Sequence, residues 1–218
     1  MNVIFVKWGT KYSSEDVNAL YNNLIEYDST YSYHCYTDDP TNLNKNINVI
    51  DIPAYPTLKK WWNKLRMFAQ EFPLEGKCMF FDIDTVVKND PFKVLEEIDN
   101  DPFKILDEVD FNKLTILDCP WKSDPVYDRT TNYDVRIASG VITWTAGNHT
   151  EMWESFFANK DYFLRKYKGI DRYIVHEKYS YETFPHTYIQ SYKYQKEIDY
   201  EPAIMTYEEV NFESRNIK

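Results

Sequence analysis

The sequence predicts a three-layer α/β fold in which helices cover both faces of a mostly parallel central sheet. Short apolar runs alternate with helical patterns along the 218 residues, and this alternation is typical of parallel sheets. One run, residues 78–81, is apolar at every position, as expected of a strand buried on both faces. No linker rich in Gly, Ser or Pro divides the chain, so residues 1–218 are predicted to form a single domain.

The individual elements follow from the spacing of apolar residues. The first strand is expected over residues 3–6, and a helix begins at Ser14 because its apolar positions share one face (Val17, Leu20, Leu24 and Ile25). The remaining strands are expected over residues 33–36, 49–52, 78–81, 114–117 and 140–144, and the remaining helices over residues 59–72 and 150–168. Beyond residue 190 the pattern weakens.

An eleven-residue segment occurs twice in tandem. Residues 89–99 (NDPFKVLEEID) are followed directly by residues 100–110 (NDPFKILDEVD), and eight of the eleven positions are identical. Two copies are too few for a solenoid, which needs about three. We interpret residues 89–110 as a surface duplication without chemistry of its own.

Charge and cysteine content exclude several classes of protein. A net charge of −10 disfavours a nucleic-acid partner, because duplex binding requires a basic surface. Cys35, Cys78 and Cys119 are few and widely spaced, which favours buried thiols over a disulfide framework. The chain starts with a strand pattern and lacks any apolar segment of about 20 residues, so we expect no membrane span and a cytoplasmic location.

Two acidic residues follow the fourth strand. At strand spacing, Asp82 and Asp84 would point the same way, and at the carboxyl end of a strand both can face a crevice. Carboxylate oxygens suit Mn²⁺ or Mg²⁺, which commonly join protein carboxylates to substrate phosphates. The alternative is a helix cap or a solvated loop, but two charges directly after a buried strand are costly without a partner.

Residues 79–87 (MFFDIDTVV) resemble the DxD segment of nucleotide-sugar glycosyltransferases with the GT-A fold, such as glycogenin-like and galactosyltransferase-like proteins. The resemblance covers residues 2–195. Further segments agree in order and spacing: residues 7–12 (KWGTKY), 35–39 (CYTDD), 62–65 (WNKL), 138–144 (ASGVITW) and 169–172 (GIDR).

The resemblance implies a metal-dependent hexosyltransferase that moves a sugar from a UDP- or GDP-linked donor to an unknown glycan or other acceptor. It divides the chain into a nucleotide-binding half (1–88), the duplication (89–110) and a donor-sugar and acceptor half (111–218). Its implied nucleotide-binding residues are Lys7, Trp8, Gly9, Thr10, Tyr12, Thr37, Lys64 and Asp82. The sugar and acceptor residues are Asp118, Arg136, Ser139 and Gly140, the diphosphate residues are Ser191 and Lys193, and the catalytic residue is Asp171.

The metal site implied by the resemblance consists of Asp82, Asp84 and a histidine, with Mn²⁺ or Mg²⁺ as the cofactor. The family often supplies that histidine from a His-Gly segment near the C-terminus, and no such segment precedes Lys218. The chain therefore lacks it, is truncated or uses another group, such as His186. A second departure is Ala138, which stands where the family often has Asn.

Several assignments have a structural alternative that the sequence leaves open. Trp8 and Tyr12 could equally be core aromatics, and Lys64 could pair with an acid or be solvated. Asp171 could be a general base or the N-cap of a helix. The segment that contains Ser191 and Lys193 could equally be a strand edge.

Two other functions fit parts of the pattern. A phosphatase of the haloacid dehalogenase type also has an apolar strand followed by Asp-x-Asp, in which the first Asp is the nucleophile. Such proteins usually have Gly-Thr after the second Asp, close to the N-terminus, whereas Thr85-Val86 follows Asp84 here. The other alternative is a non-catalytic protein that binds nucleotide sugars on the same scaffold.

Overall fold

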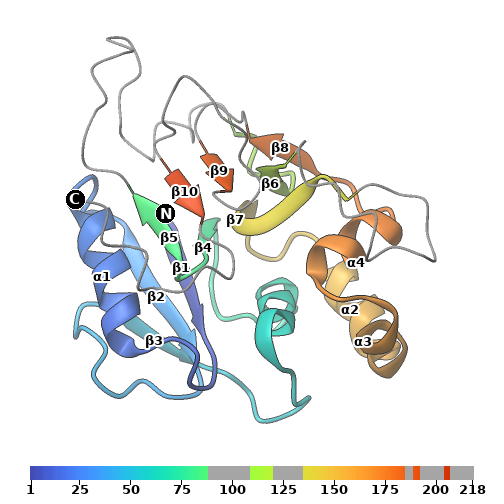
Figure 1. Cartoon of the computed structure of the whole chain (residues 1–218), viewed down its shortest axis with the longest axis horizontal. Coiled ribbons are helices and arrows are strands. Elements are labelled where there is room, and N and C mark those ends of the chain that lie inside the picture. The colour runs from blue at the N-terminus through green and yellow to red at the C-terminus, as the bar shows by residue number, and fades with distance from the viewer. Residues whose placement is uncertain (88–108, 120–134, 185–188, 192–203, 207–218) are drawn as a thin grey trace.

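A computed structural model describes residues 1–87, 109–119, 135–184, 189–191 and 204–206. It has the predicted three-layer α/β architecture (Figure 1). The strands are β1 (Asn2–Lys7), β2 (Ser32–Thr37), β3 (Asn48–Asp51), β4 (Lys77–Phe81), β5 (Thr85–Val87), β6 (Thr115–Asp118), β7 (Ile137–Thr145), β8 (Glu182–Phe184), β9 (Ile189–Ser191) and β10 (Ile204–Thr206). The helices are α1 (Ser14–Ile25), the 3₁₀ helix η1 (Lys60–Phe68), α2 (Thr150–Ala158), α3 (Lys160–Lys166) and α4 (Ile170–His176).

The central sheet has seven strands in the order β3-β2-β1-β4-β7-β6-β8. Strand β7 is antiparallel to both of its neighbours, β4 and β6, and all other pairings in this sheet are parallel. The mostly parallel sheet is therefore confirmed. Strand β4 is the middle strand, which confirms that residues 78–81 lie in the interior of the sheet.

The apolar strands support one core on each face of the sheet. Val3 and Phe5 of β1 pack with α1, whereas Ile4 between them packs on the opposite face with η1, α2 and α4. Met79 and Phe80 of β4 divide in the same way. This alternation follows from strand geometry, and each fully buried apolar side chain contributes roughly 1.5–3 kcal/mol.

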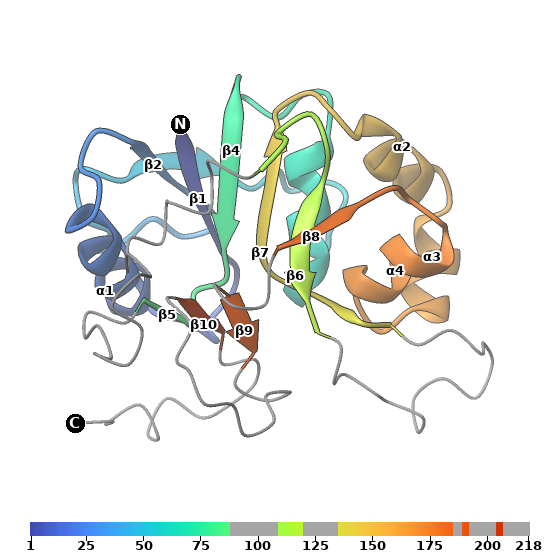
Figure 2. The same cartoon turned by 90° about the horizontal axis from the view of Figure 1, so that it is seen from above.

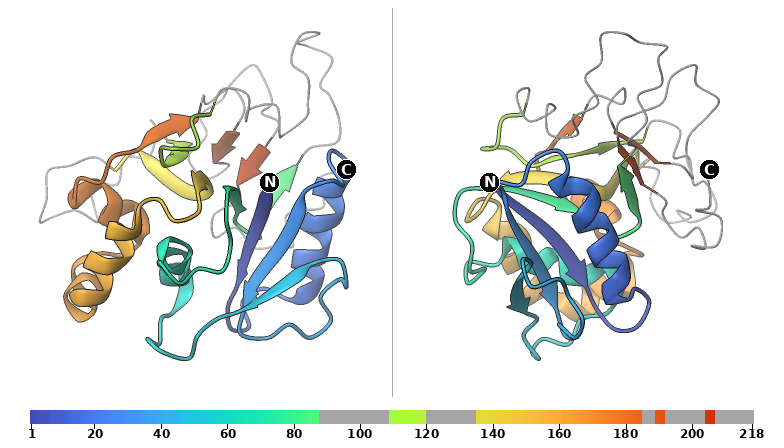
Figure 3. Two further views of the ribbon diagram at one scale, coloured as in Figure 1. Left: turned by 180° about the vertical axis from the view of Figure 1, so that it is seen from behind. Right: turned by 90° about the vertical axis from the view of Figure 1, so that its left-hand side faces the viewer.

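The helices lie on opposite sides of the sheet, with α1 on one side and η1, α2, α3 and α4 on the other (Figure 3). Helix α1 has a well-defined start. The Ser13 hydroxyl accepts a hydrogen bond from the Asp16 backbone N–H, and the Asp16 carboxylate accepts one from the Ser13 backbone N–H. This capping box satisfies two backbone donors that a helix start otherwise leaves unpaired.

Two helices differ from the expectation. The predicted amphipathic α-helix over residues 59–72 is the 3₁₀ helix η1, which stops before an extended Ala69. Its residues 62–68 are all buried, so packing on every side overrides the helical period. The predicted helix over residues 150–168 divides into α2 and α3 at Asn159, whose backbone is not helical. Asparagine favours such a break because its side chain competes for backbone hydrogen bonds.

A smaller sheet in the order β5-β10-β9 lies beside the main sheet, and the turn that contains Asp82 and Asp84 connects β4 to β5 (Figure 2). Cys35, Cys78 and Cys119 are buried thiols, as predicted. Within the described ranges, no helix is long and apolar enough to cross a membrane. Most of the duplication, residues 89–108, lies outside the described residues.

Candidate active site

Most of the predicted site residues that the structure describes gather along one edge of the main sheet. Strands β1, β2, β4 and β6 run in the same direction and end at this edge, where the antiparallel strand β7 begins (Figure 2). The strand ends carry Lys7, Thr37, Asp82, Asp118 and Ser139. Ligands of open α/β sheets bind outside the carboxyl ends of the parallel strands, so this edge is the candidate active site.

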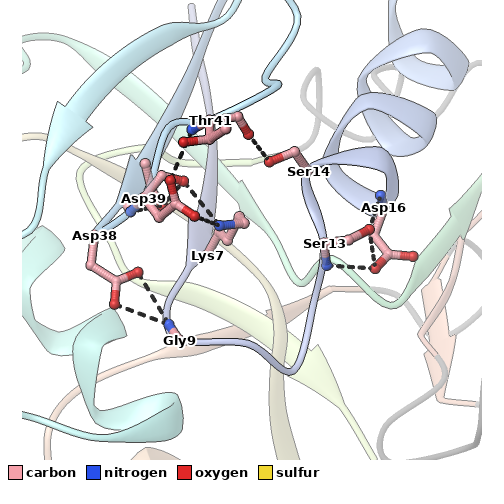
Figure 4. Close-up of polar contacts among 9 residues, drawn as sticks. Lys7, Gly9, Ser13, Ser14, Asp16, Asp38, Asp39 and Thr41 are labelled. Carbon is pink, nitrogen blue, oxygen red and sulfur yellow. Dashed lines mark hydrogen bonds and ion pairs between the residues drawn. The ribbon is translucent and has the colours of Figure 1, made fainter.

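The β1–α1 loop is fixed by the end of β2 (Figure 4). The backbone N–H of Gly9 donates to both carboxylate oxygens of Asp38 at 3.1 Å, and Gly9 has φ 65°. Lys7 is only 3% exposed, and its ammonium group donates to the Asp39 carbonyl oxygen at 2.9 Å. Thr37 closes the arrangement through hydrogen bonds with the Asp39 backbone.

Of the predicted residues in this loop, Trp8 is half-buried and Thr10 is exposed, so both can be reached from solvent. The anchoring roles of Asp38 and Asp39 were not predicted. Their signal in the sequence is an acidic pair directly after the second strand. Because β2 pairs in parallel with β1, with Thr37 opposite Lys7, this pair faces the start of the loop.

The acidic pair lies in a turn and not in a strand. The Thr85 backbone N–H donates to the Asp82 carbonyl oxygen at 3.0 Å, which closes the turn around a buried Ile83. The expectation that strand alternation makes both carboxylates point the same way is therefore wrong, because Asp82 and Asp84 are not in a strand. Both residues do follow the end of β4, as expected. The acids have different partners: Asp82 lies against Lys64, and Asp84 lies against Tyr12.

Lys64 is a buried cation at the centre of the site. Its ammonium group donates to Asp82 Oδ2 at 2.6 Å and to the Ser139 carbonyl oxygen at 3.0 Å. The solvated alternative for Lys64 is therefore wrong. Since η1 supplies this cation, the negative charge of Asp82, whose side chain is 25% exposed, is balanced by the protein itself. The Asp84 carboxylate has no such cation among its described partners.

Asp171 lies in the first turn of α4, two residues after the N-cap. Its Oδ1 atom accepts a hydrogen bond from the Ser139 backbone N–H at 3.0 Å. The N-cap is Gly169, which has no capping side chain, so the alternative that Asp171 is the helix N-cap is wrong. Ser139 thus lies between Asp82 and Asp171. Its carbonyl oxygen accepts from Lys64, which also pairs with Asp82, and its backbone N–H donates to Asp171.

The remaining predicted residues are placed less centrally. Arg136 is exposed directly before β7, and Gly140 accepts a hydrogen bond from the Asp82 backbone N–H at 2.7 Å. Asp118 is half-buried at the end of β6. Ser191 ends β9 in the smaller sheet, opposite Thr206 of β10. Lys193 and His186 lie outside the described residues, so their predicted roles remain predictions.

A divalent cation fits the described acids only if substrate completes its coordination. No group of three or more His, Cys, Asp or Glu side chains is placed to hold a metal within the ranges described. Mg²⁺ in proteins is usually bound by one or two carboxylates together with substrate phosphates and water. Asp82 and Asp84 offer carboxylate oxygens of that kind, and of the two Asp82 is already paired with a cation of the protein, Lys64.

Two cavities are lined by other residues. One, of about 160 Å³, is bounded by Tyr36, Arg66 and Phe72, and the other, of about 340 Å³, by Tyr55, Trp153 and Phe157. Neither is lined by a predicted site residue. The candidate site is identified by the convergence of charged side chains from several strands.

Comparison with known proteins agrees with this architecture. No family model and no curated protein matches the sequence. Among solved structures, the glycosyltransferase GlyE of Streptococcus pneumoniae TIGR4 is similar with a TM-score of 0.61 and 15% identity, over 94% of this chain and 54% of that chain. The galactosyltransferase LgtC, in complex with donor and acceptor sugar analogues, is similar with a TM-score of 0.57 and 14% identity, over 95% of this chain and 87% of that chain.

A third structure, a glycosyltransferase involved in glycosylation of the major capsid of PBCV-1, has a TM-score of 0.51 and 13% identity, over 96% of this chain and 94% of that chain. The chain thus spans about half of GlyE and most of the other two. At this identity the likeness concerns architecture. The chain has the GT-A glycosyltransferase fold that its sequence predicts.

Proposed function

We propose that this protein is a glycosyltransferase that moves a sugar from a UDP- or GDP-linked donor to a glycan or other acceptor, assisted by a divalent cation. The observation that carries the proposal is the position of the acidic turn. Asp82 and Asp84 lie at the carboxyl end of the central strand, between the anchored β1–α1 loop and the pair of Ser139 and Asp171. A nucleotide on one side and a sugar on the other would meet at this turn.

The nucleotide would bind over the β1–α1 loop. The ring of Tyr12 and the half-buried Trp8 offer flat surfaces for a base, and their backbone is held by the Gly9 and Asp38 contacts. Lys7 and Thr37 are buried and support the loop through their hydrogen bonds to the Asp39 backbone. These residues orient the donor and exclude water from its base.

The diphosphate would lie above the acidic turn. When bound, Mn²⁺ or Mg²⁺ would supply neutralisation of the diphosphate leaving group, with Asp84 as its direct ligand and Asp82 in a supporting role. Lys64 holds Asp82 in place and keeps the site from carrying two unbalanced negative charges. Ser191 and Lys193 are proposed as further diphosphate contacts.

The acceptor would approach from the side of α4. Asp171 is proposed to orient or deprotonate the acceptor hydroxyl as the glycosidic bond breaks. The hydrogen bond from the Ser139 N–H to Asp171 Oδ1 restrains the orientation of this carboxylate. Arg136 and Asp118, at the same edge, are proposed contacts of the donor sugar or acceptor.

The proposal is tested by titrating the purified chain with UDP and GDP in the presence and absence of Mn²⁺, by calorimetry. We expect one nucleotide to bind more tightly with Mn²⁺, and Asp84→Ala to abolish that Mn²⁺ dependence while circular dichroism shows an intact fold. Unchanged Mn²⁺-dependent binding in Asp84→Ala would contradict the metal assignment.

Incubation with UDP- and GDP-sugars then separates three functions. Release of free sugar in water, which is common when a transferase lacks its acceptor, supports transfer. Hydrolysis of a simple phosphate ester would favour the phosphatase alternative. Tight nucleotide-sugar binding without any turnover across a panel of acceptors would favour the non-catalytic binding protein.

A further inference from the structure

The side chain of Tyr12 reaches across the site to the second acid of the turn. Its hydroxyl donates to Asp84 Oδ2 at 2.6 Å, although the two residues are 72 positions apart in the sequence. Asp84 is 6% exposed, and the Tyr12 hydroxyl is the hydrogen-bond partner that its carboxylate has among the described residues. A buried carboxylate needs such a donor, because burial removes its water.

Tyr12 is itself held from several sides. Its ring packs against the core beneath α1, and the Lys11 ammonium lies 4.5 Å from the ring centroid. The residue that follows, Ser13, is fixed by the capping box of α1, and Gly9 is fixed by Asp38. The Tyr12 hydroxyl therefore has a defined position, and its hydrogen bond fixes the position of Asp84 Oδ2.

A hydrogen bond to one carboxylate oxygen restricts rotation of the whole group. With Oδ2 turned toward Tyr12, the other oxygen of Asp84 is the one presented to a ligand. Residues that hydrogen-bond a metal-ligating carboxylate fix its orientation, and their loss typically lowers metal affinity by about 10- to 100-fold.

We propose that Tyr12 is a positioning residue for the cation site: its hydroxyl orients Asp84 to bind a divalent cation, while its ring belongs to the nucleotide-binding loop. This inference rests on the proposed function, in which Asp84 is the direct ligand. It makes one residue contribute to both subsites, so the occupancy of the loop and the affinity for the cation are coupled. Such coupling is reciprocal, because each ligand changes the affinity for the other by the same factor.

The test separates the hydroxyl of Tyr12 from its ring. Mn²⁺ is titrated, with and without UDP or GDP, into wild type, Tyr12→Phe, Asp84→Asn and a matched control, Tyr33→Phe, with the affinity measured by calorimetry and by the free-Mn²⁺ spin-resonance signal. Tyr33 is a suitable control because its hydroxyl also donates a short hydrogen bond, 2.7 Å to the Asp28 carbonyl oxygen, away from the acidic turn. Thermal unfolding shows whether each variant keeps its fold.

We expect Tyr12→Phe to weaken Mn²⁺ binding by about tenfold or more, and Tyr33→Phe to change it by less than about twofold. UDP and GDP binding is measured in each variant with and without Mn²⁺, so that any loss of nucleotide binding itself is separated from the loss of Mn²⁺ dependence. The factor by which Mn²⁺ tightens nucleotide binding should fall in Tyr12→Phe.

Three results would overturn the inference. If Asp84→Asn loses Mn²⁺ binding but Tyr12→Phe binds Mn²⁺ as tightly as wild type or more tightly, the Tyr12 hydroxyl does not position Asp84. The proposed cation site at Asp84 is then supported without the inference about Tyr12. If Tyr33→Phe weakens Mn²⁺ binding equally, the effect is a general loosening of the fold. If wild type binds no Mn²⁺ with or without nucleotide, the cation assignment fails together with the inference.

Discussion

The ammonium group of Lys64 lies 2.6 Å from Asp82 Oδ2, so a buried cation from η1 is paired with the first acid of the turn after β4. The same ammonium donates to the Ser139 carbonyl oxygen, at the start of β7. Lys64 therefore joins the helical layer to two adjacent strands of the sheet. This arrangement gives Lys64 a structural role in addition to its predicted role in nucleotide binding.

Replacing Lys64 by Met should lower the free energy of unfolding by about 2 kcal/mol, because Asp82 and the Ser139 carbonyl lose a charged donor. The matched control is Lys113→Met, which removes an exposed ion pair with Glu182 and should cost clearly less, because water screens that pair. Urea unfolding measures both. Equal losses in the two variants would show that the Lys64 pair is worth no more than a surface pair.

Asp171→Asn should reduce the rate of sugar transfer by about 100-fold or more, since the amide cannot accept the acceptor proton. The amide oxygen can still accept the Ser139 N–H, so the fold and the donor affinity should change by less than about tenfold. Single-turnover transfer and nucleotide calorimetry separate the two effects. A full transfer rate in the variant would leave Asp171 with a structural role, and Asp118 would be the next carboxylate to test.

Gly9→Ala should destabilise the chain by about 1–2 kcal/mol because of its left-handed backbone, φ 65°, and not through a clash, since no atom lies within 4 Å of the new Cβ. Gly76→Ala is a matched control with φ 77° and equally open space, placed before β4 at the other end of the strand. Both variants should lose similar stability by urea unfolding, but only Gly9→Ala should weaken nucleotide binding. Equal nucleotide affinity in both would remove Gly9 from the predicted site.

Acidification should destabilise the protein partly through His34. Burial in β2 lowers the pKa of this imidazole below its ordinary value of 6.5, and Nε2 lies 3.1 Å from Asn2 Oδ1. The unfolded chain then binds the proton more readily than the folded chain. The contribution of the neutral His34 to the free energy of unfolding is therefore complete above about pH 6.5 and is lost as the pH drops through the folded-state pKa.

The measurement compares urea unfolding of wild type and His34→Gln at about pH 7.5 and about pH 5.5. We expect the loss of unfolding free energy on acidification to be smaller in the variant, where the amide can keep the contact with Asn2 without titrating. The half-buried His149, whose pKa is also lowered by desolvation, accounts for part of the loss that remains. An identical loss in both proteins would exclude His34 as a contributor.

The sequence predicted the sheet well because its strands are short apolar runs. β4 was placed correctly in the interior, since each of its residues 78–81 is apolar. The direction of β7 could not be predicted, because strand direction depends on pairing with β4 and β6 and not on local pattern. The 3₁₀ form of η1 was missed for a related reason, since tertiary burial outweighed the helical period.

The site was predicted as a set of residues but not as a set of contacts. Asp82 and Asp84 were found from a charge pair after a buried strand, but their turn geometry depends on the departure of the chain into the second sheet. The partnership of Tyr12 with Asp84, and of Gly9 with Asp38, joins segments far apart in the sequence. No local pattern encodes such pairs.

The buried thiols offer a native chemical probe of how the sheet opens. Burial raises the pKa of Cys35 in β2 to about 12 and that of Cys78 in β4 to about 11, so little thiolate forms near neutral pH. Alkylating reagents therefore react only when a strand separates from its neighbours. Because β2 and β4 lie on opposite sides of β1, the ratio of the two modification rates would reveal whether the sheet comes apart on both sides of β1 together or one side first.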